Sequence, residues 1–107
     1  MAHSDTLFRL EATILSRRDA APETSYVAKL NARGLNKIAQ KLGEEATETV
    51  IAALAEDRTA LVGEAADLLF HLVVLLAARD VPLNDVLAEL DRREGVSGIA
   101  EKAARSL

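Results

Sequence analysis

The chain contains 107 residues, of which half are apolar, and it carries a formal net charge of −4 at pH 7. This length suits a single domain spanning residues 1–107, and the acidic balance argues against a nucleic-acid partner. Because the sequence has no cysteine, disulfides and thiolate-bound metals are excluded, which fits a cytoplasmic protein.

The first two expected helices are short. The composition favours helices, since Ala, Leu and Val dominate and the only aromatic residues are two Phe and one Tyr. Ser4 or Asp5 is suited to cap the first helix. Thr24 or Ser25 is suited to cap the second, which we expect to end at Arg33 because a glycine follows.

Two long helices are expected next, from about Leu35 to Ala55 and from about Arg58 to Arg79, with an acidic corner between them. Asn84 is suited to cap a fifth helix, which Gly95 would end. A last short turn follows from Ser97 through Arg105. No segment shows the alternation of a strand, so the expected fold class is all-α with five to six helices.

Neither export nor membrane insertion is expected. The first residues lack the basic and apolar regions of a secretory signal. The longest nearly uncharged run, residues 68–78, is too short to span a bilayer.

The first long helix has a charged residue within its apolar face. At about 100° per residue, that face comprises Ile38, Leu42, Ala46, Thr49 and Ala53. Glu45 falls inside this sector, with Lys41 and Glu48 at one edge.

The second long helix is apolar almost all round, so we expect it to be buried on most sides. Its only polar stripe in the middle turns consists of Glu64, Asp67 and His71. One small chain offers this helix too few neighbours. We therefore expect a homodimer with a four-helix-bundle-type core, formed by the two long helices and including Val73 and Leu76 at the interface.

The acidic residues of these helices form a pattern, Glu44-Glu45-x-x-Glu48 and then Glu64-x-x-Asp67. Spacing of three residues places each pair on one helix face, so two antiparallel helices could bring four carboxylates together. Like charges this close repel unless a cation lies between them. Carboxylate oxygens suit a hard cation such as Mg²⁺, which commonly also binds substrate phosphates.

A purely structural interpretation competes with this one, because acidic residues on helices are usually solvated. Two observations favour a metal site: Glu45 interrupts an apolar face, and the second pair lies on an apolar helix. His71 either makes a structural hydrogen bond or acts near the site. Lys37 and Lys41 either pair with neighbouring glutamates or face the phosphates of a substrate.

Two segments, residues 37–48 (KIAQKLGEEATE) and 64–72 (EAADLLFHL), resemble the phosphoribosyl-ATP pyrophosphatase family. This family belongs to the MazG-like all-α nucleotide pyrophosphohydrolases, whose shared signature is EExxE followed by ExxD. Residues 25–30 (SYVAKL) and 97–103 (SGIAEKA) extend the resemblance over nearly the whole chain and favour this branch. Val27 stands where the family pattern leads us to expect Thr.

The resemblance implies Mg²⁺-dependent hydrolysis of 1-(5-phosphoribosyl)-ATP to 1-(5-phosphoribosyl)-AMP and pyrophosphate, the second step of histidine biosynthesis. It implies Glu45, Glu48, Glu64 and Asp67 as ligands of Mg²⁺, with Mn²⁺ as the alternative ion. Glu44 would be an acid that orients water or a ligand, and it joins the four ligands in the expected catalytic set. The expected substrate-binding residues are Lys37, Lys41 and His71. The resemblance also implies a dimer with its active site near the subunit interface.

Two other functions compete with this expectation. A housecleaning pyrophosphatase of the same superfamily, acting on non-canonical dNTPs, would share the metal site and differ in its base pocket. A non-catalytic helical dimerisation module would need neither magnesium nor a nucleotide.

Overall fold

The computed structural model describes residues 3–105, which form six helices and contain no strand. The helices are α1 (Thr6–Arg17), α2 (Tyr26–Arg33), α3 (Leu35–Ala55), α4 (Arg58–Ala78), α5 (Leu83–Arg93) and α6 (Gly98–Arg105). The all-α prediction is confirmed, and both long helices lie within one residue of their expected bounds.

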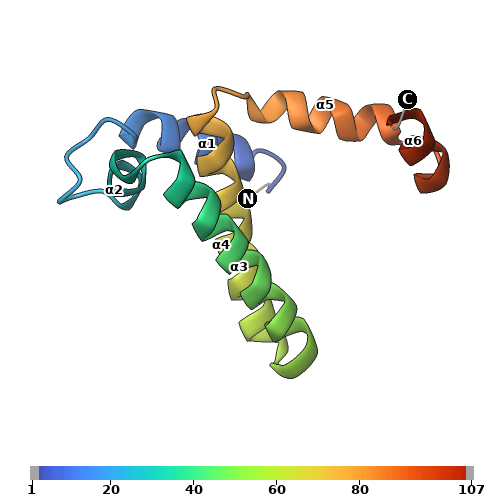
Figure 1. The fold of residues 1–107 in the computed structure, drawn as a ribbon, viewed down its shortest axis with the longest axis horizontal. Coiled ribbons are helices and arrows are strands. Elements are labelled where there is room, and N and C mark those ends of the chain that lie inside the picture. The colour runs from blue at the N-terminus through green and yellow to red at the C-terminus, as the bar shows by residue number, and fades with distance from the viewer. Residues whose placement is uncertain (1–2, 106–107) are drawn as a thin grey trace.

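The antiparallel pair of α3 and α4 forms the stalk of the molecule, as Figure 1 shows. Asp57 caps α4, its carboxylate accepting a hydrogen bond from the Ala60 amide at 2.9 Å. Further along, the Thr49 hydroxyl oxygen lies 2.8 Å from the Glu45 carbonyl oxygen and 3.1 Å from the Glu64 carbonyl oxygen. Thr49 thereby fixes the register of the two helices at the level of the acidic residues.

The hydrophobic core lies at one end of this stalk, where α1 and α2 cover the start of α3 and the end of α4 (Figure 1). Its buried members are Ile14, Val27, Leu30, Ile38, Val73, Val74 and Ala77. The single chain does not cover α4 on every side, because Val62 is 61% exposed and Leu69 is exposed too, so burial of α4 on most sides stays a prediction for the dimer. The prediction of Val73 at a subunit interface is wrong, since this side chain is 2% exposed within its own core.

The packed line of α3 differs from the predicted face. Ile38, Glu45 and Ala52, spaced by seven residues, are its buried side chains, whereas Ala53 is exposed. The predicted face is therefore rotated slightly from the packed line, because it includes Ala53 and leaves out Ala52, whereas the position of Glu45 within it is confirmed. The carboxylate of Glu45 lies on the line that faces α4.

Several predicted caps are present. The Ser25 hydroxyl accepts from the Ala28 amide at 3.2 Å, and the Ser97 hydroxyl accepts from the Ala100 amide at 3.1 Å. Gly34 ends α2 with a φ of 95°, a conformation that disfavours any residue with a Cβ. Asp5 precedes α1 but makes no side-chain cap, since its carboxylate pairs with Arg9 instead.

The predicted cap of the fifth helix is wrong. α5 begins at Leu83, one residue before Asn84, and Pro82 occupies the N-cap position. The Leu83 amide donates to the Glu11 carboxylate of α1 at 2.7 Å. The carboxylate of Glu11, on another helix, therefore accepts a hydrogen bond at the start of α5, a role that the local sequence predicts for the Asn84 side chain.

Helices α5 and α6 form an arm that projects from the stalk (Figure 1). At its end the buried Glu101 carboxylate lies 2.8 Å from Arg92, 3.3 Å from Arg105 and 3.6 Å from Arg93. Hydrogen bonds from Arg92 and Arg93 lower the pKa of Glu89 to about 2. These ion pairs join α6 to α5.

Candidate metal site

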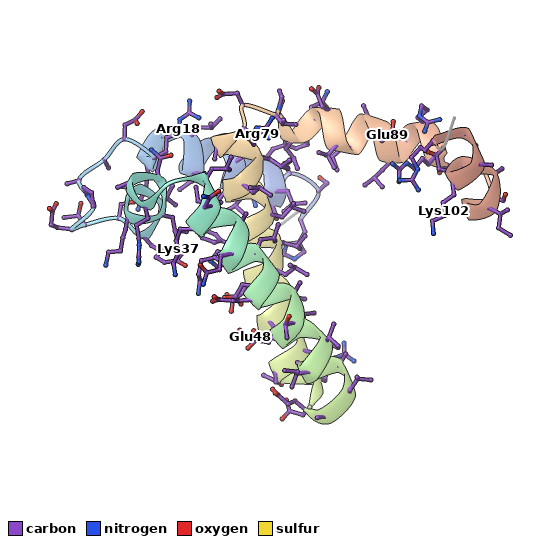
Figure 2. The ribbon with its side chains drawn as sticks, viewed as in Figure 1. Arg18, Lys37, Glu48, Arg79, Glu89 and Lys102 are labelled. Atoms are coloured by element: carbon purple, nitrogen blue, oxygen red, sulfur yellow. The ribbon has the colours of Figure 1, made fainter. Side chains whose placement is uncertain are left out.

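Three carboxylates meet where α3 and α4 face each other. Glu45, Glu48 and Glu64 each offer an oxygen atom, and these atoms lie within 4.8 Å of one another. We call this group the acidic cluster. Figure 2 shows Glu48 beside the middle of the stalk, with Lys37 nearer the end of α3 that adjoins α2.

Each member of the acidic cluster has a different exposure. Glu45 is buried because it occupies the packed line of α3, Glu48 is exposed one turn later, and Glu64 is half-buried on α4. One carboxylate oxygen of Glu45 and one of Glu64 are buried and have no hydrogen-bond partner. Such atoms are costly unless a cation or a proton satisfies them.

The pKa values of the acidic cluster also indicate that its carboxylates require a cation or a proton. Burial, followed by the Glu48 carboxylate, raises the pKa of Glu45. Burial and contact with Glu48 also raise the pKa of Glu64. The chain alone therefore disfavours full ionisation of these acids, whereas a divalent cation would favour it.

Asp67 lies outside the group of three and its residue is exposed. Its negative charge nevertheless contributes to the raised pKa values of Glu45 and Glu64, so it lies near the acidic cluster. The structure thus brings together three of the four expected ligands and leaves the fourth at the rim.

Glu44 is exposed and also lies outside the group of three. Its carboxylate accepts from the Gln40 amide nitrogen at 2.8 Å and pairs with the Lys41 ammonium at 3.3 Å. These two hydrogen bonds lower its pKa. Lys41 also lies 3.8 Å from Glu45, so it connects Glu44 to the acidic cluster. Lys37 is half-buried one turn earlier.

His71 is buried and hydrogen-bonded at both ring nitrogens. Its Nδ1 lies 2.7 Å from the Asp67 carbonyl oxygen, which can only accept, so Nδ1 carries the proton. In the neutral ring Nε2 then accepts from the Tyr26 hydroxyl at 2.9 Å. His71 therefore makes structural hydrogen bonds while lying beside the turn that carries Asp67.

Sequence reasoning missed Tyr26. This residue begins α2 and meets His71 across a separation of 45 residues. Its ring also stacks against Phe70, with a centroid distance of 6.0 Å and an interplanar angle of 25°. The one available signal was compositional, because this is the only tyrosine of the chain.

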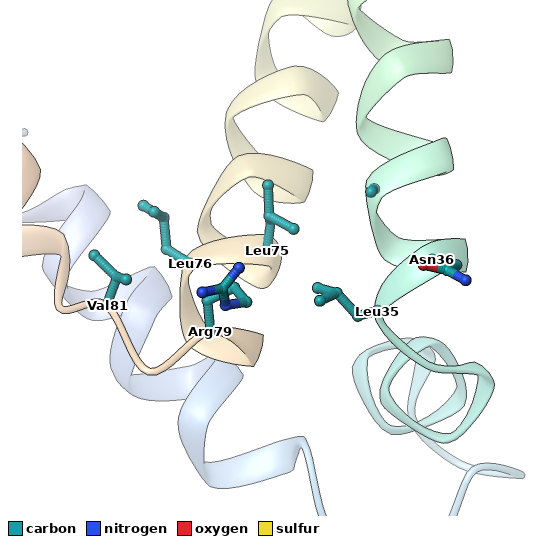
Figure 3. Close-up of a pocket in the computed structure, with 7 residues that line it drawn as sticks. Leu35, Asn36, Leu75, Leu76, Arg79 and Val81 are labelled. Atoms are coloured by element: carbon teal, nitrogen blue, oxygen red, sulfur yellow. The ribbon is translucent and has the colours of Figure 1, made fainter.

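An apolar pocket lies away from these acids. It has a volume of about 460 Å³ and is lined by Leu35, Asn36, Ala39, Leu75, Leu76, Arg79 and Val81. Figure 3 shows the labelled side chains around the start of α3 and the end of α4, with Val81 on the segment that follows α4. None of the expected ligands lines it, so pocket volume does not locate the acidic cluster.

The acidic cluster fits a hard divalent cation. Its donors are all carboxylate oxygens, two of which are buried without a partner. Oxygen donors of this kind suit Mg²⁺ or Mn²⁺, and the exposed side of the group leaves room for water and phosphate oxygens.

Comparison with known proteins decides the family. Residues 7–94 match the family described as phosphoribosyl-ATP pyrophosphohydrolase. The chain belongs to this family.

The phosphoribosyl-ATP pyrophosphohydrolase family includes relatives that cover almost the whole chain. A protein of Novosphingobium aromaticivorans named phosphoribosyl-ATP pyrophosphatase is 73% identical over 106 residues, covering 99% of each chain. Proteins of the same name from Rhizorhabdus wittichii and Rhodobacter capsulatus are 72% and 64% identical. The match to the Rhizorhabdus protein covers 94% of each chain. The match to the Rhodobacter protein covers 92% of this chain and 96% of the relative. The chain is accordingly an enzyme of the hydrolase class, and the resemblance found in the sequence is confirmed.

Proposed function

We propose that this protein hydrolyses 1-(5-phosphoribosyl)-ATP to 1-(5-phosphoribosyl)-AMP and pyrophosphate, as a step of histidine biosynthesis, with Mg²⁺ as its cofactor. The relatives' names support the reaction. The observation that supports a metal-dependent mechanism is the acidic cluster, with its two unpartnered buried oxygens.

Glu45, Glu48 and Glu64 would hold the cation, and Asp67 at the rim would complete the set. A bound Mg²⁺ would neutralise phosphate charge and lower the pKa of a bound water. Thr49 keeps the carboxylates of α3 and α4 opposite each other through its contacts with both backbones. This register is the part of the site that the chain itself preorganises.

Residues at the rim supply the remaining roles. Contact with Glu44 raises the pKa of Lys41, so its ammonium stays charged and can attract phosphate oxygens. Lys37 lies one turn away on the same helix and would take a second phosphate oxygen. Glu44 stays ionised because its pKa is lowered, and it would accept a hydrogen bond from the attacking water.

Direct comparison of substrates tests the reaction. Purified protein with Mg²⁺ should release pyrophosphate from phosphoribosyl-ATP at least about 100-fold faster, in kcat/KM, than from ATP or dUTP, since discrimination of 10²-fold or more requires dedicated contacts. Equal rates with all three would favour a general housecleaning pyrophosphatase. Absence of turnover with any nucleotide would favour a non-catalytic dimerisation module.

We further propose a cytoplasmic homodimer that binds neither nucleic acid nor membrane. The radius of gyration is 15.8 Å, above the roughly 13 Å of a compact domain near this length. Exposed apolar side chains run along the stalk, among them Val50, Leu54, Val62 and Leu69. A second copy would bury this surface in a four-helix core.

Helix α4 is long and apolar enough to cross a membrane by length and composition alone. Glu64 and Asp67 lie within that stretch, where charged side chains would be costly in lipid. Its buried residues also pack against the core of the chain, which supports a core helix rather than a membrane span.

A further inference from the structure

Tyr26 is exposed and yet held in place. Its side chain is 46% exposed, although its hydroxyl is fixed by His71 at 2.9 Å. The Phe70 ring stacks against it at 6.0 Å, and the His71 ring meets it nearly edge-on, at 81°. A ring that keeps so much surface open while its orientation is set by three contacts is a preorganised stacking surface.

This ring adjoins the acidic cluster. His71 connects it to Asp67, since the same imidazole that accepts from Tyr26 donates to the Asp67 carbonyl. Lys41 lies 3.8 Å from Glu45, and Tyr26 is among the neighbours that contribute to its raised pKa, so Lys41 lies near both the ring and the acidic cluster. A ligand whose phosphates reach the acids could therefore place its base on the tyrosine.

We propose that Tyr26 is the platform on which the purine ring of the substrate stacks, a role that rests on the proposed function. A purine offers a flat π-surface that matches the open part of the tyrosine ring. An adenine ring substituted at N1 also carries positive charge near neutral pH, and a cation over the tyrosine face gains further attraction. Tyr26 would thus favour phosphoribosyl-ATP over ATP, whose N1 is unsubstituted.

A purely structural role for Tyr26 makes a different prediction. If its task were only to hold His71, the hydroxyl would matter and the ring would not. Tyr26→Phe keeps the ring and removes the hydroxyl, whereas Tyr26→Leu removes the stacking surface. Phe8→Leu is the matched control, because Phe8 is a part-exposed aromatic residue on α1 whose ring pairs with none of the rings of Tyr26, Phe70 and His71.

Steady-state kinetics distinguish the two roles. Tyr26→Leu should raise KM for phosphoribosyl-ATP by roughly tenfold with a much smaller change in kcat, as expected for one lost base-stacking contact. Tyr26→Phe should raise KM much less than Tyr26→Leu does, because it keeps the ring, and Phe8→Leu should stay within about twofold of the parent protein. An unchanged KM in Tyr26→Leu, or an equal loss in Tyr26→Phe and Tyr26→Leu, would overturn the platform.

Tyrosine fluorescence gives a second readout that needs no substitution. The chain contains one tyrosine and no tryptophan, so this emission comes from Tyr26 alone. The product 1-(5-phosphoribosyl)-AMP should quench the Tyr26 emission, whereas pyrophosphate, which has no base, should not. Free tyrosine amide measured with the same ligands gives the correction for their absorbance. If saturating product leaves the Tyr26 emission unquenched, the stacking role of Tyr26 is refuted even when hydrolysis is normal. Loss of the proposed function would appear separately, as absence of hydrolysis by the unmodified protein.

Discussion

The carboxylates of the acidic cluster make different contributions despite their shared chemistry. Glu45 is buried on the packed line of α3, whereas Glu48 is exposed and Glu64 lies between these extremes. Each supplies a negative charge that would help to hold a bound cation.

Glu45→Gln, Glu48→Gln and Glu64→Gln should each lower kcat/KM by about 100-fold or more, because loss of one ligand weakens the metal and misplaces the phosphates. Asp67→Asn should have the same direction of effect with a smaller magnitude, since Asp67 lies outside the group of three. The pyrophosphate-release assay measures this, with circular dichroism confirming the fold. Near-normal turnover in two of the three Gln variants would rule out the proposed site.

The metal-free protein should lose stability as pH rises. The folded-state pKa values of Glu45 and Glu64 are raised. Their contribution is therefore fully present below the unfolded-state pKa, about 4.3, and is lost as pH rises through the raised values. In EDTA, the melting temperature of the parent minus that of Glu45→Gln should fall over this range. Saturating Mg²⁺ should reverse the fall at neutral pH. A difference that is flat with pH would contradict repulsion within the acidic cluster.

At the scale of helices, local sequence determines most boundaries. Ser25, Asp57 and Ser97 cap their helices through their own side chains, and Gly34 takes the positive φ that a helix end often needs. The start of α5 could not be predicted in this way, because its acceptor comes from Glu11 in another helix.

Hydrophobic periodicity identified α3 and α4 but did not say which neighbour covers each face. Val73 was expected between subunits and lies in the core of its own chain, because α1 and α2 cover that end of α4. The acidic pairs could be found from i,i+3 spacing alone. The Tyr26–His71 contact could not, since no local pattern joins residues so far apart in sequence.

Thr49→Val tests the register between α3 and α4. It should lower stability by about 1 kcal/mol, the usual value of one part-buried hydrogen bond, and should also reduce activity by loosening the acidic cluster. Thr47→Val is the matched control, because the exposed Thr47 hydroxyl contacts only the Gly43 carbonyl of its own helix. Thermal melts and the hydrolysis assay measure both effects. Equal effects of the two substitutions would show that the contact between helices is unimportant.

At the scale of the whole molecule, the single chain leaves much of its stalk uncovered. Leu54 on α3 is 83% exposed and Val62 on α4 is 61% exposed, although other residues of the two helices pack against each other. A surface of this kind is typical of an interface between copies.

Val62→Glu and Leu69→Glu should therefore dissociate the proposed dimer, since each would place a charge in an apolar interface. Both side chains are exposed in the single chain, so neither substitution disrupts the chain's own core. Ile99→Glu, at an 86% exposed position of α6, serves as a control for added charge. Light scattering should give a mass near twice 11.5 kDa for the parent and the control, and a lower mass for the two stalk variants. A parent protein that is monomeric and active at micromolar concentration would refute the dimer.

The corner between α4 and α5 is held from a distant part of the chain. Arg18 donates to the Ala77 carbonyl at 3.0 Å, on the near side of the corner, and Glu11 accepts from Leu83 on the far side. Glu11 belongs to α1 and Arg18 directly follows it. Their hydrogen bonds therefore hold the end of α4 and the start of α5 against α1, which fixes the angle between stalk and arm. The direction of the last two helices is consequently encoded some seventy residues upstream of them. A substitution of Glu11 would therefore change the direction of α5 relative to α4 without altering either helix.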